Sequence, residues 1–195
     1  MGNYKNIFGW FEFQNTYDYA IDTFDNCLFV EIGCFLGKSA AYLGEQIRNK
    51  NKNIKVLCVD LWPSKDELDE YRSIDAGQGG ERKIIEELEL SLMETFINNM
   101  NHCKLRDIIY PIRCDSPLAA SLFPDEYFQF IFIDAGHSYE QVTRDLQAWY
   151  PKLKTGGLIA GHDYYGPTAN AVNDFFNNMG EIKSVSMNTW EFYKY

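Results

Sequence analysis

The chain has 195 residues, which is the size of one ordinary domain of about 100 to 200 residues. Hydrophobic residues make up 46% and charged residues 24%, and this composition excludes a chain that is disordered throughout. Acidic residues outnumber basic ones by 28 to 18, and the net charge of −10 argues against nucleic acid or an anionic membrane as a partner.

The termini and the cysteines bear on the cellular compartment. No apolar run reaches the roughly 18 residues that a membrane-spanning helix needs, and residues 1–10 lack the pattern of a secretion signal. The five cysteines are scattered without a CxxC pair, which favours reduced, mostly buried thiols over a disulfide or zinc framework. We therefore expect a cytoplasmic protein.

Five short apolar runs without polar alternation are typical of strands covered on both faces, as in a parallel sheet. They are residues 27–32, 54–59, 108–112, 128–133 and 157–160. Helical spacing of apolar residues between these runs predicts helices over 39–47, along a stripe from 84 to 100, and over 168–179. Strands that alternate with helices predict a doubly wound, Rossmann-like α/β fold.

Local signals mark where two helices begin and how the chain ends. Ser138 and Gln141 form a capping-box pattern ahead of a helix that follows the fourth strand. Pro167 lies just inside the start of the last helix and Gly180 just past its end. Residues 182–186 and 189–193 flank a short turn, so we expect the chain to close with an antiparallel hairpin.

The first predicted strand runs into a turn with two glycines, Gly33 and Gly37, ahead of a helix start. Ligands of such sheets bind beyond the carboxyl ends of the strands, so we expect this turn to bind one. A phosphate-binding loop needs four residues between its first glycine and Gly-Lys-Ser, and three are present here. A dinucleotide fingerprint needs a third glycine. The remaining alternative is an S-adenosylmethionine turn, in which Glu31 receives the ligand.

Acidic residues also follow the second and third predicted strands. Asp60 lies 23 positions after Gly37, near the spacing of about 20 at which a carboxylate accepts ribose hydroxyls. We prefer this role for Asp60 over that of a loop residue or helix cap. After the third strand, Asp115 or Ser116 could bond an adenine amino group, but Asp115 could equally cap a helix beginning near Pro117. Both interpretations of Asp115 stay open.

The fourth and fifth predicted strands end in Asp134 and His137 and in His162 and Asp163. Adjacent parallel strands bring their carboxyl ends together, so two carboxylates and two of the chain's three histidines should converge. This combination predicts a divalent metal site with a titratable group beside it. Each residue alone could be a cap or a satisfied polar group, and His102, without such company, is expected to be structural.

Three sequence segments together resemble class I S-adenosylmethionine-dependent methyltransferases. They are Glu31-Ile-Gly-x-x-x-Gly-x-Ser39, Phe132-Ile-Asp134-x-x-His137-Ser-Tyr139 and Gly156-Gly-x-Ile-x-Gly-His-Asp163-Tyr164, joined by the strand-ending Asp60. Within that class the sequence is similar to the metal-dependent O-methyltransferases that act on small molecules, such as the catechol, caffeoyl-CoA and macrocin-type enzymes. The resemblance runs from about residue 27 to 195 and implies a seven-stranded sheet with an antiparallel last strand.

The resemblance also implies roles for individual residues. It places Glu31, Ser39, Asp60, Asp115 or Ser116, and Asp134 around the cofactor, with Gly33 and Gly37 shaping the turn. Asp134 and Asp163 become ligands of Mg²⁺ or another divalent ion, and His137 becomes the general base. Relatives often carry an acidic residue before the second metal aspartate, where this sequence has His162. His162 could itself be a metal ligand and shift the preference of the site toward a softer ion. Alternatively, metal binding could be weaker or lost.

We expect one domain over residues 1–195, with an aromatic-rich cover over 1–26, a cofactor-binding core over 27–195 and an insertion near 63–104. The aromatic residues of the cover are assigned to core or interface packing rather than to substrate contact. Residues 63–81 have the composition of a lid. Either segment could form a dimer surface, so a homodimer stays open.

The expected partner is a small-molecule hydroxyl acceptor, a sugar or catechol-like diol, and neither nucleic acid nor a membrane. Two alternatives to a methyltransferase remain at this point. One is a nucleotide hydrolase of the P-loop type, and the other is a cofactor-binding module without catalytic activity.

Overall fold

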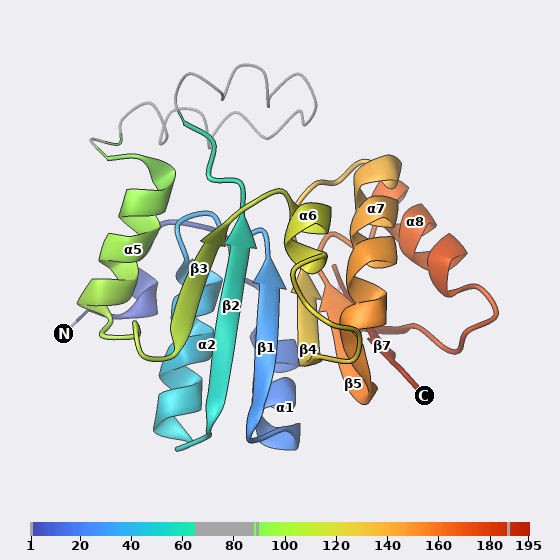
Figure 1. Ribbon diagram of the computed structural model, residues 1–195, viewed down its shortest axis with the longest axis horizontal. Coiled ribbons are helices and arrows are strands. Elements are labelled where there is room, and N and C mark those ends of the chain that lie inside the picture. Colours follow the sequence, from blue (N-terminus) through green and yellow to red (C-terminus); the bar gives the residue numbers. More distant parts are fainter. Residues whose placement is uncertain (1, 65–87, 89, 187) are drawn as a thin grey trace.

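A seven-stranded sheet lies between two layers of helices in the computed structural model, which describes residues 2–64, 88, 90–186 and 188–195 (Figure 1). The strands are β1 (Cys27–Ile32), β2 (Ile54–Asp60), β3 (Ile109–Arg113), β4 (Phe128–Ile133), β5 (Leu153–Gly161), β6 (Lys183–Ser186) and β7 (Thr189–Tyr193). Their order is β3-β2-β1-β4-β5-β7-β6. The first five strands pair in parallel, and β7 runs antiparallel to both of its neighbours. The predicted fold class and closing hairpin are confirmed.

Helices cover both faces of the sheet. One face carries α1 (Gln14–Thr23), α2 (Lys38–Asn49) and α5 (Leu92–His102), and the other carries α6 (Ser116–Ala120), α7 (Tyr139–Trp149) and α8 (Gly166–Phe176). Two short 3-10 helices, η1 (Tyr4–Asn6) and η2 (Tyr150–Lys152), complete the described elements. No helix among the described residues is long and apolar enough to cross a membrane.

The helix boundaries follow local chemistry, with one correction. The predicted capping box is present, because the Ser138 hydroxyl accepts the Gln141 N–H while the Gln141 side chain accepts the Ser138 N–H. The last helix ends at Phe176, three residues earlier than predicted. The backbone leaves the helical region at Asn177, whose ψ is +123°, and Asn178 follows with a left-handed φ of +70°.

The N-terminal cover contains a helix that the sequence patterns did not reveal. In α1, Tyr17 and Ile21 are fully buried against the sheet, and Phe11 and Phe13 ahead of it are buried as well. The expectation of core packing therefore holds for these side chains. Phe8 and Trp10 are exposed, so for these two side chains the interface alternative stays a prediction.

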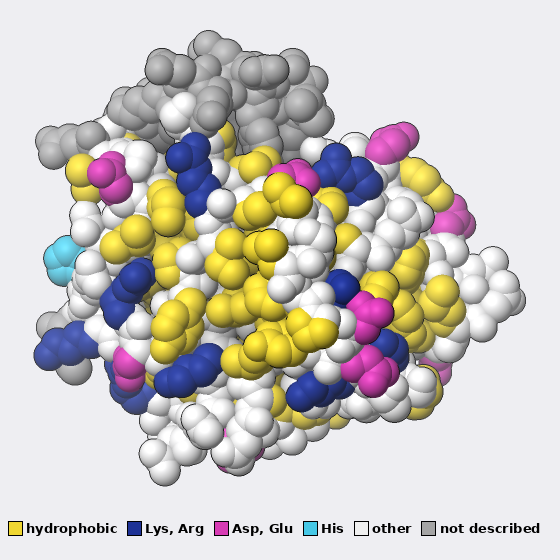
Figure 2. Space-filling model, in the orientation of Figure 1, with side chains coloured by type: hydrophobic (Ala, Val, Ile, Leu, Met, Phe, Trp, Pro, Cys, Tyr) yellow, Lys and Arg dark blue, Asp and Glu magenta, His cyan; other side chains and the backbone are white. Residues whose placement is uncertain are grey.

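The α6 face of the sheet is covered unevenly. With five residues, α6 is about 7.5 Å long, whereas the seven-residue β2 extends over about 23 Å. Hydrophobic side chains are consequently visible on the surface over β1 to β3 and α6 (Figure 2).

Candidate active site

Gly33 and Gly37 shape the turn after β1, and both need to be glycine. Their φ angles are +82° and +86°, in the left-handed region that other residues rarely adopt. A Cβ on Gly33 would lie 2.0 Å from the carbonyl oxygen of Asp134, and one on Gly37 would lie 2.7 Å from the Met100 Cε. The turn after β1 thus packs directly on the end of β4, which places Asp134 beside the predicted cofactor turn.

Asp60, at the end of β2, holds the same turn in place. Its Oδ2 accepts the backbone N–H groups of Cys34 at 2.8 Å and Phe35 at 2.9 Å, and its Oδ1 accepts the Trp62 N–H at 2.8 Å. These bonds use three of about four lone-pair sites on the carboxylate. Burial raises the pKa of Asp60 and outweighs the backbone hydrogen bonds that favour its charged form. The ribose role stays a prediction, and the structure adds a turn-bracing role to it.

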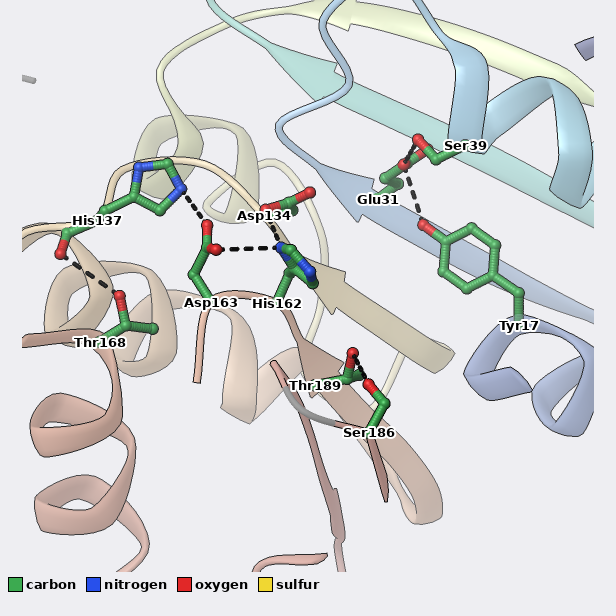
Figure 3. A network of polar contacts seen from close by, with 10 residues as sticks. All are labelled: Tyr17, Glu31, Ser39, Asp134, His137, His162, Asp163, Thr168, Ser186 and Thr189. Carbon is green, nitrogen blue, oxygen red and sulfur yellow. Dashed lines mark hydrogen bonds and ion pairs between the residues drawn. The ribbon is translucent and has the colours of Figure 1, made fainter. Parts of the chain in front are cut away.

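Glu31 lies under the turn rather than in the open. Its side chain is buried, and its Oε1 accepts hydrogen bonds from the hydroxyls of Ser39 and Tyr17, the latter at 3.0 Å (Figure 3). Burial raises the pKa of Glu31 to about 7, against the opposing effect of the two hydroxyl bonds. Glu31 and Ser39 are thus together as the resemblance implies, but their mutual bond and Tyr17 occupy the carboxyl group.

We expect the Glu31→Gln variant to gain stability relative to the natural protein as the pH rises from 5 to 8. Between the ordinary pKa near 4.5 and the folded value near 7, the unfolded chain releases a proton that folded Glu31 keeps, so the natural protein loses stability across that window. Glutamine does not titrate. The difference in unfolding free energy between the Glu31→Gln variant and the natural protein should change by about 3 kcal/mol between pH 5 and pH 8. Urea denaturation at both pH values measures it.

The exposed Glu140→Gln serves as the matched control for this comparison, with no such pH-dependent difference expected. A Glu31→Gln difference that is the same at pH 5 and pH 8 would show that the buried carboxyl titrates normally.

Asp115 and Ser116 lie at the start of α6. Asp115 occupies the N-cap position without a side-chain capping bond, and its carboxylate pairs with Arg144 at 3.1 Å. The Ser116 hydroxyl donates to Asp145 at 2.5 Å and accepts the indole N–H of Trp149 at 2.9 Å. Asp115 therefore does not cap α6 through its side chain. The adenine role of Asp115 or Ser116 stays a prediction.

Asp134, His137, His162 and Asp163 converge beyond the ends of β4 and β5, as the sequence predicts (Figure 3). The His137 Nε2 lies 2.7 Å from Asp163 Oδ2. The His162 Nδ1 lies 3.3 Å from Asp163 Oδ1 and 3.8 Å from Asp134 Oδ1. Asp134, His162 and Asp163 each offer one ligand atom, and these atoms all lie within 4.8 Å of one another.

The charges of this cluster are strongly coupled. Burial favours the neutral acid, yet hydrogen bonds from His137 and His162 outweigh it and hold the pKa of Asp163 well below its usual range. Burial also disfavours a charged His162, but the carboxylates of Asp163 and Asp134 outweigh this and raise its pKa. The two carboxylates therefore favour positive charge at this cluster, which is the electrostatic condition for holding a cation.

Comparison with known proteins decides the class of the molecule. The family model described as "Methyltransferase domain" matches residues 30–164, which includes the turn after β1 and all four clustered residues. The chain belongs to this methyltransferase family. It is therefore an S-adenosylmethionine-dependent methyltransferase. No curated protein matches the sequence closely enough to count as a relative.

Solved structures share the methyltransferase fold at low sequence identity. The O-methyltransferase NovP has a TM-score of 0.65 at 19% identity, with 92% of this chain and 78% of NovP covered. CalS11, a TDP-rhamnose 3'-O-methyltransferase of calicheamicin biosynthesis, has a TM-score of 0.57 at 11% identity, covering 92% and 76%. Cofactor-bound Rv0187 from MTB has a TM-score of 0.62 at 12% identity, covering 95% and 82%. At these identities the likeness concerns the fold alone.

The structure places two further residues beside the candidate site that sequence reasoning missed. Tyr165 follows the Asp163 motif at the N-cap of α8, and the nearby Asp163 carboxylate raises the pKa of its phenol. The ring of Phe13 lies 5.2 Å from that of His162. Proximity to the motif could have indicated Tyr165, but nothing in the local sequence placed Phe13 there.

Two further expectations concern other parts of the chain. His102 ends α5 and contacts the Asn98 carbonyl at 2.7 Å, in keeping with a structural role. The predicted lid over 63–81 and the first part of the apolar stripe from 84 lie almost entirely outside the described residues.

Proposed function

We propose that this methyltransferase transfers a methyl group to a hydroxyl oxygen of a small molecule with the help of a divalent cation. The observation that carries the proposal is the convergence of two carboxylates and two histidines at the ends of β4 and β5, next to the cofactor turn. An acceptor with two neighbouring oxygens, such as a sugar diol or a catechol, suits such a site.

The donor set fits a divalent ion. Asp134, His162 and Asp163 would hold it, since their ligand atoms are already grouped and half-buried. Carboxylate oxygens suit Mg²⁺ and Mn²⁺, whereas an imidazole nitrogen extends the range to Fe²⁺ or Zn²⁺. The other ring nitrogen of His162, Nε2, is buried without a hydrogen-bond partner among the described residues, so its ring is held by packing and by its Nδ1 contacts.

The cofactor when bound supplies the methyl group, and the cation when bound lowers the pKa of the acceptor hydroxyl. The chain itself orients the reactants and removes the proton. His137 is suited to take it, because a proton on Nε2 bonded to Asp163 leaves the basic lone pair of the ring on Nδ1. Asp163 thereby fixes the tautomer and orientation of His137.

Calorimetry with S-adenosylhomocysteine and Mn²⁺ tests the cofactor and the metal separately. We expect the product to bind with or without the metal, and Mn²⁺ to bind the natural protein. The Asp163→Asn variant should lose at least about tenfold in Mn²⁺ affinity while keeping its affinity for S-adenosylhomocysteine.

The exposed Asp174→Asn serves as the control, because its carboxylate contacts Tyr139 outside the cluster. Binding of S-adenosylhomocysteine without any metal binding would contradict the metal-dependent mechanism. If metal binds but the metal-loaded protein does not methylate sugar or catechol diols, the acceptor belongs to another chemical class.

A further inference from the structure

A second group of potential metal ligands lies beneath the cofactor turn, apart from the cluster at the ends of β4 and β5. It consists of Glu31, Cys34 and Cys58, and one ligand atom of each lies within 4.8 Å of those of the other two. All three residues are buried. The spacing of the cysteines in the sequence gave no sign of this group, because Cys58 comes beside Glu31 only through the pairing of β1 with β2.

The Cys58 thiol lies on the Oε2 side of the Glu31 carboxyl group, with the Cys34 thiol beside it. The Oε1 atom accepts the hydroxyls of Ser39 and Tyr17 (Figure 3), whereas Oε2 lies 3.8 Å from the Cys58 Sγ. The Cys34 Sγ lies 3.4 Å from the Glu31 carbonyl oxygen and also interacts with the Cys58 thiol. Because a thiol is a weak hydrogen-bond donor, metal bonds at these three atoms would displace only weak contacts.

The distances among the three ligand atoms suit a metal ion after a small contraction. The centre of an equilateral triangle with 4.8 Å sides lies about 2.8 Å from each corner, whereas Zn–S and Zn–O bonds are about 2.3 Å and 2.0 to 2.2 Å long. Inward shifts of about 0.5 to 0.8 Å would therefore close the site. The bonds from Ser39 and Tyr17 to Oε1 would remain and orient the ligating carboxylate.

The chemistry of the three donors selects a thiophilic cation. Thiolates prefer soft or borderline d¹⁰ ions such as Zn²⁺, Cd²⁺ and Cu⁺, whereas Mg²⁺ and Mn²⁺ prefer oxygen ligands. Burial raises the pKa of both thiols, so an ion must displace their protons when it binds. Two thiolates then balance the charge of a divalent ion, which favours binding because an uncompensated buried charge is costly.

We propose that Glu31, Cys34 and Cys58 form a binding site for a thiophilic d¹⁰ cation, and that its occupation opposes cofactor binding. Cys34 belongs to the cofactor turn, and Glu31 is the carboxyl group predicted to receive the cofactor. An ion would hold both from beneath the turn. Because Gly33 packs directly on the Asp134 carbonyl, the turn has little room to follow a shift of Cys34. The effect on the cofactor rests on the proposed role of this turn, whereas the metal site itself does not.

Titration of the fully reduced protein with Cd²⁺, followed by ultraviolet absorption, tests the site. Cd²⁺ bound to thiolates gives a charge-transfer band, to which the carboxylates and histidines at the ends of β4 and β5 do not contribute. We expect one equivalent of Cd²⁺ to give this band. Cys58→Ala should lower the Cd²⁺ affinity at least about a hundredfold, because even outer-shell partners of a metal contribute about 10- to 100-fold.

Cys103→Ala is the matched control for this titration. Cys103 is also a buried thiol, but it belongs to neither candidate group among the described residues, so the band and the affinity should not change. Cooperative urea unfolding verifies that each variant is folded. A titration without the band, or a band that keeps its full affinity in both Cys34→Ala and Cys58→Ala, would overturn the site.

Calorimetry tests the opposition between the ion and the cofactor. One equivalent of Cd²⁺ should weaken binding of S-adenosylhomocysteine to the natural protein at least about tenfold and should leave Cys58→Ala unaffected. A thiolate band with unchanged affinity for S-adenosylhomocysteine would overturn the opposition while supporting the site. Absence of S-adenosylhomocysteine binding before any Cd²⁺ is added would contradict the role of the turn in cofactor binding, and the band would still decide the metal site.

Discussion

Replacing His137 by alanine should lower the rate of methyl transfer about 10²- to 10⁴-fold. The variant loses the imidazole that Asp163 contacts at 2.7 Å, and with it the group that we propose takes the proton of the acceptor hydroxyl. Affinity for S-adenosylhomocysteine should stay nearly unchanged, since His137 is not among the residues assigned to the cofactor. Single-turnover kinetics measures the chemical step, and calorimetry measures the affinity.

The control for this experiment is His102→Ala, because His102 is exposed at the end of α5 and its side chain bonds the nearby Asn98 carbonyl, outside the cluster. It should leave the rate unchanged. A His137→Ala enzyme with the full single-turnover rate would transfer the role of base to His162 or to water. Loss of cofactor affinity in the same variant would instead indicate that His137 shapes the cofactor site.

Replacing Gly33 by alanine should destabilise the protein by about 3 kcal/mol or more and abolish cofactor binding. The left-handed backbone alone costs a non-glycine residue about 1 to 2 kcal/mol. The added Cβ would also collide with the Asp134 carbonyl, which is backbone and cannot rotate away. Either the turn after β1 or the end of β4 must therefore move, and both belong to the site. Urea denaturation measures the loss of stability.

Gly156 separates the two effects. Its φ of +78° is close to that of Gly33, but among the described residues, apart from its two neighbours in the chain, no heavy atom lies within 4 Å of a Cβ placed on it. We expect Gly156→Ala to lose only the conformational part, about 1 kcal/mol, and to bind S-adenosylhomocysteine normally. Equal losses in the two variants would show that the contact between the turn and β4 relaxes without cost.

Much of the fold could be predicted from the sequence because its signals are local. The buried parallel strands appear as short apolar runs, and the capping box at Ser138 fixes the start of α7. The short α6 and the helical form of residues 14–23 were less accessible. In α1 Tyr17 is buried whereas Tyr19 is exposed, and which of the two is buried depends on the sheet below, which is a tertiary effect.

The candidate site was predictable in its location and only partly in its contacts. The convergence of Asp134 and Asp163 follows from strand adjacency, which topology alone dictates. The burial of Glu31 beneath Ser39 and Tyr17 does not follow from strand adjacency, because Tyr17 comes from a segment that precedes the sheet. The same holds for the turn-bracing bonds of Asp60, whose backbone donors depend on the loop conformation.

The hydrogen bond from Tyr17 to Glu31 links two events that are usually treated separately. Docking of the N-terminal segment and ordering of the cofactor turn share one buried carboxyl group, and Lys38, in the first turn of α2, also bonds the Gly9 carbonyl. The free energy of docking the N-terminal segment and that of ordering the cofactor turn are therefore not additive. By thermodynamic reciprocity, any factor by which docking of residues 9–17 changes the affinity for a ligand of the turn equals the factor by which that ligand changes the docking of the segment. Substitutions in the segment that precedes the sheet are thus expected to change cofactor affinity as well as stability.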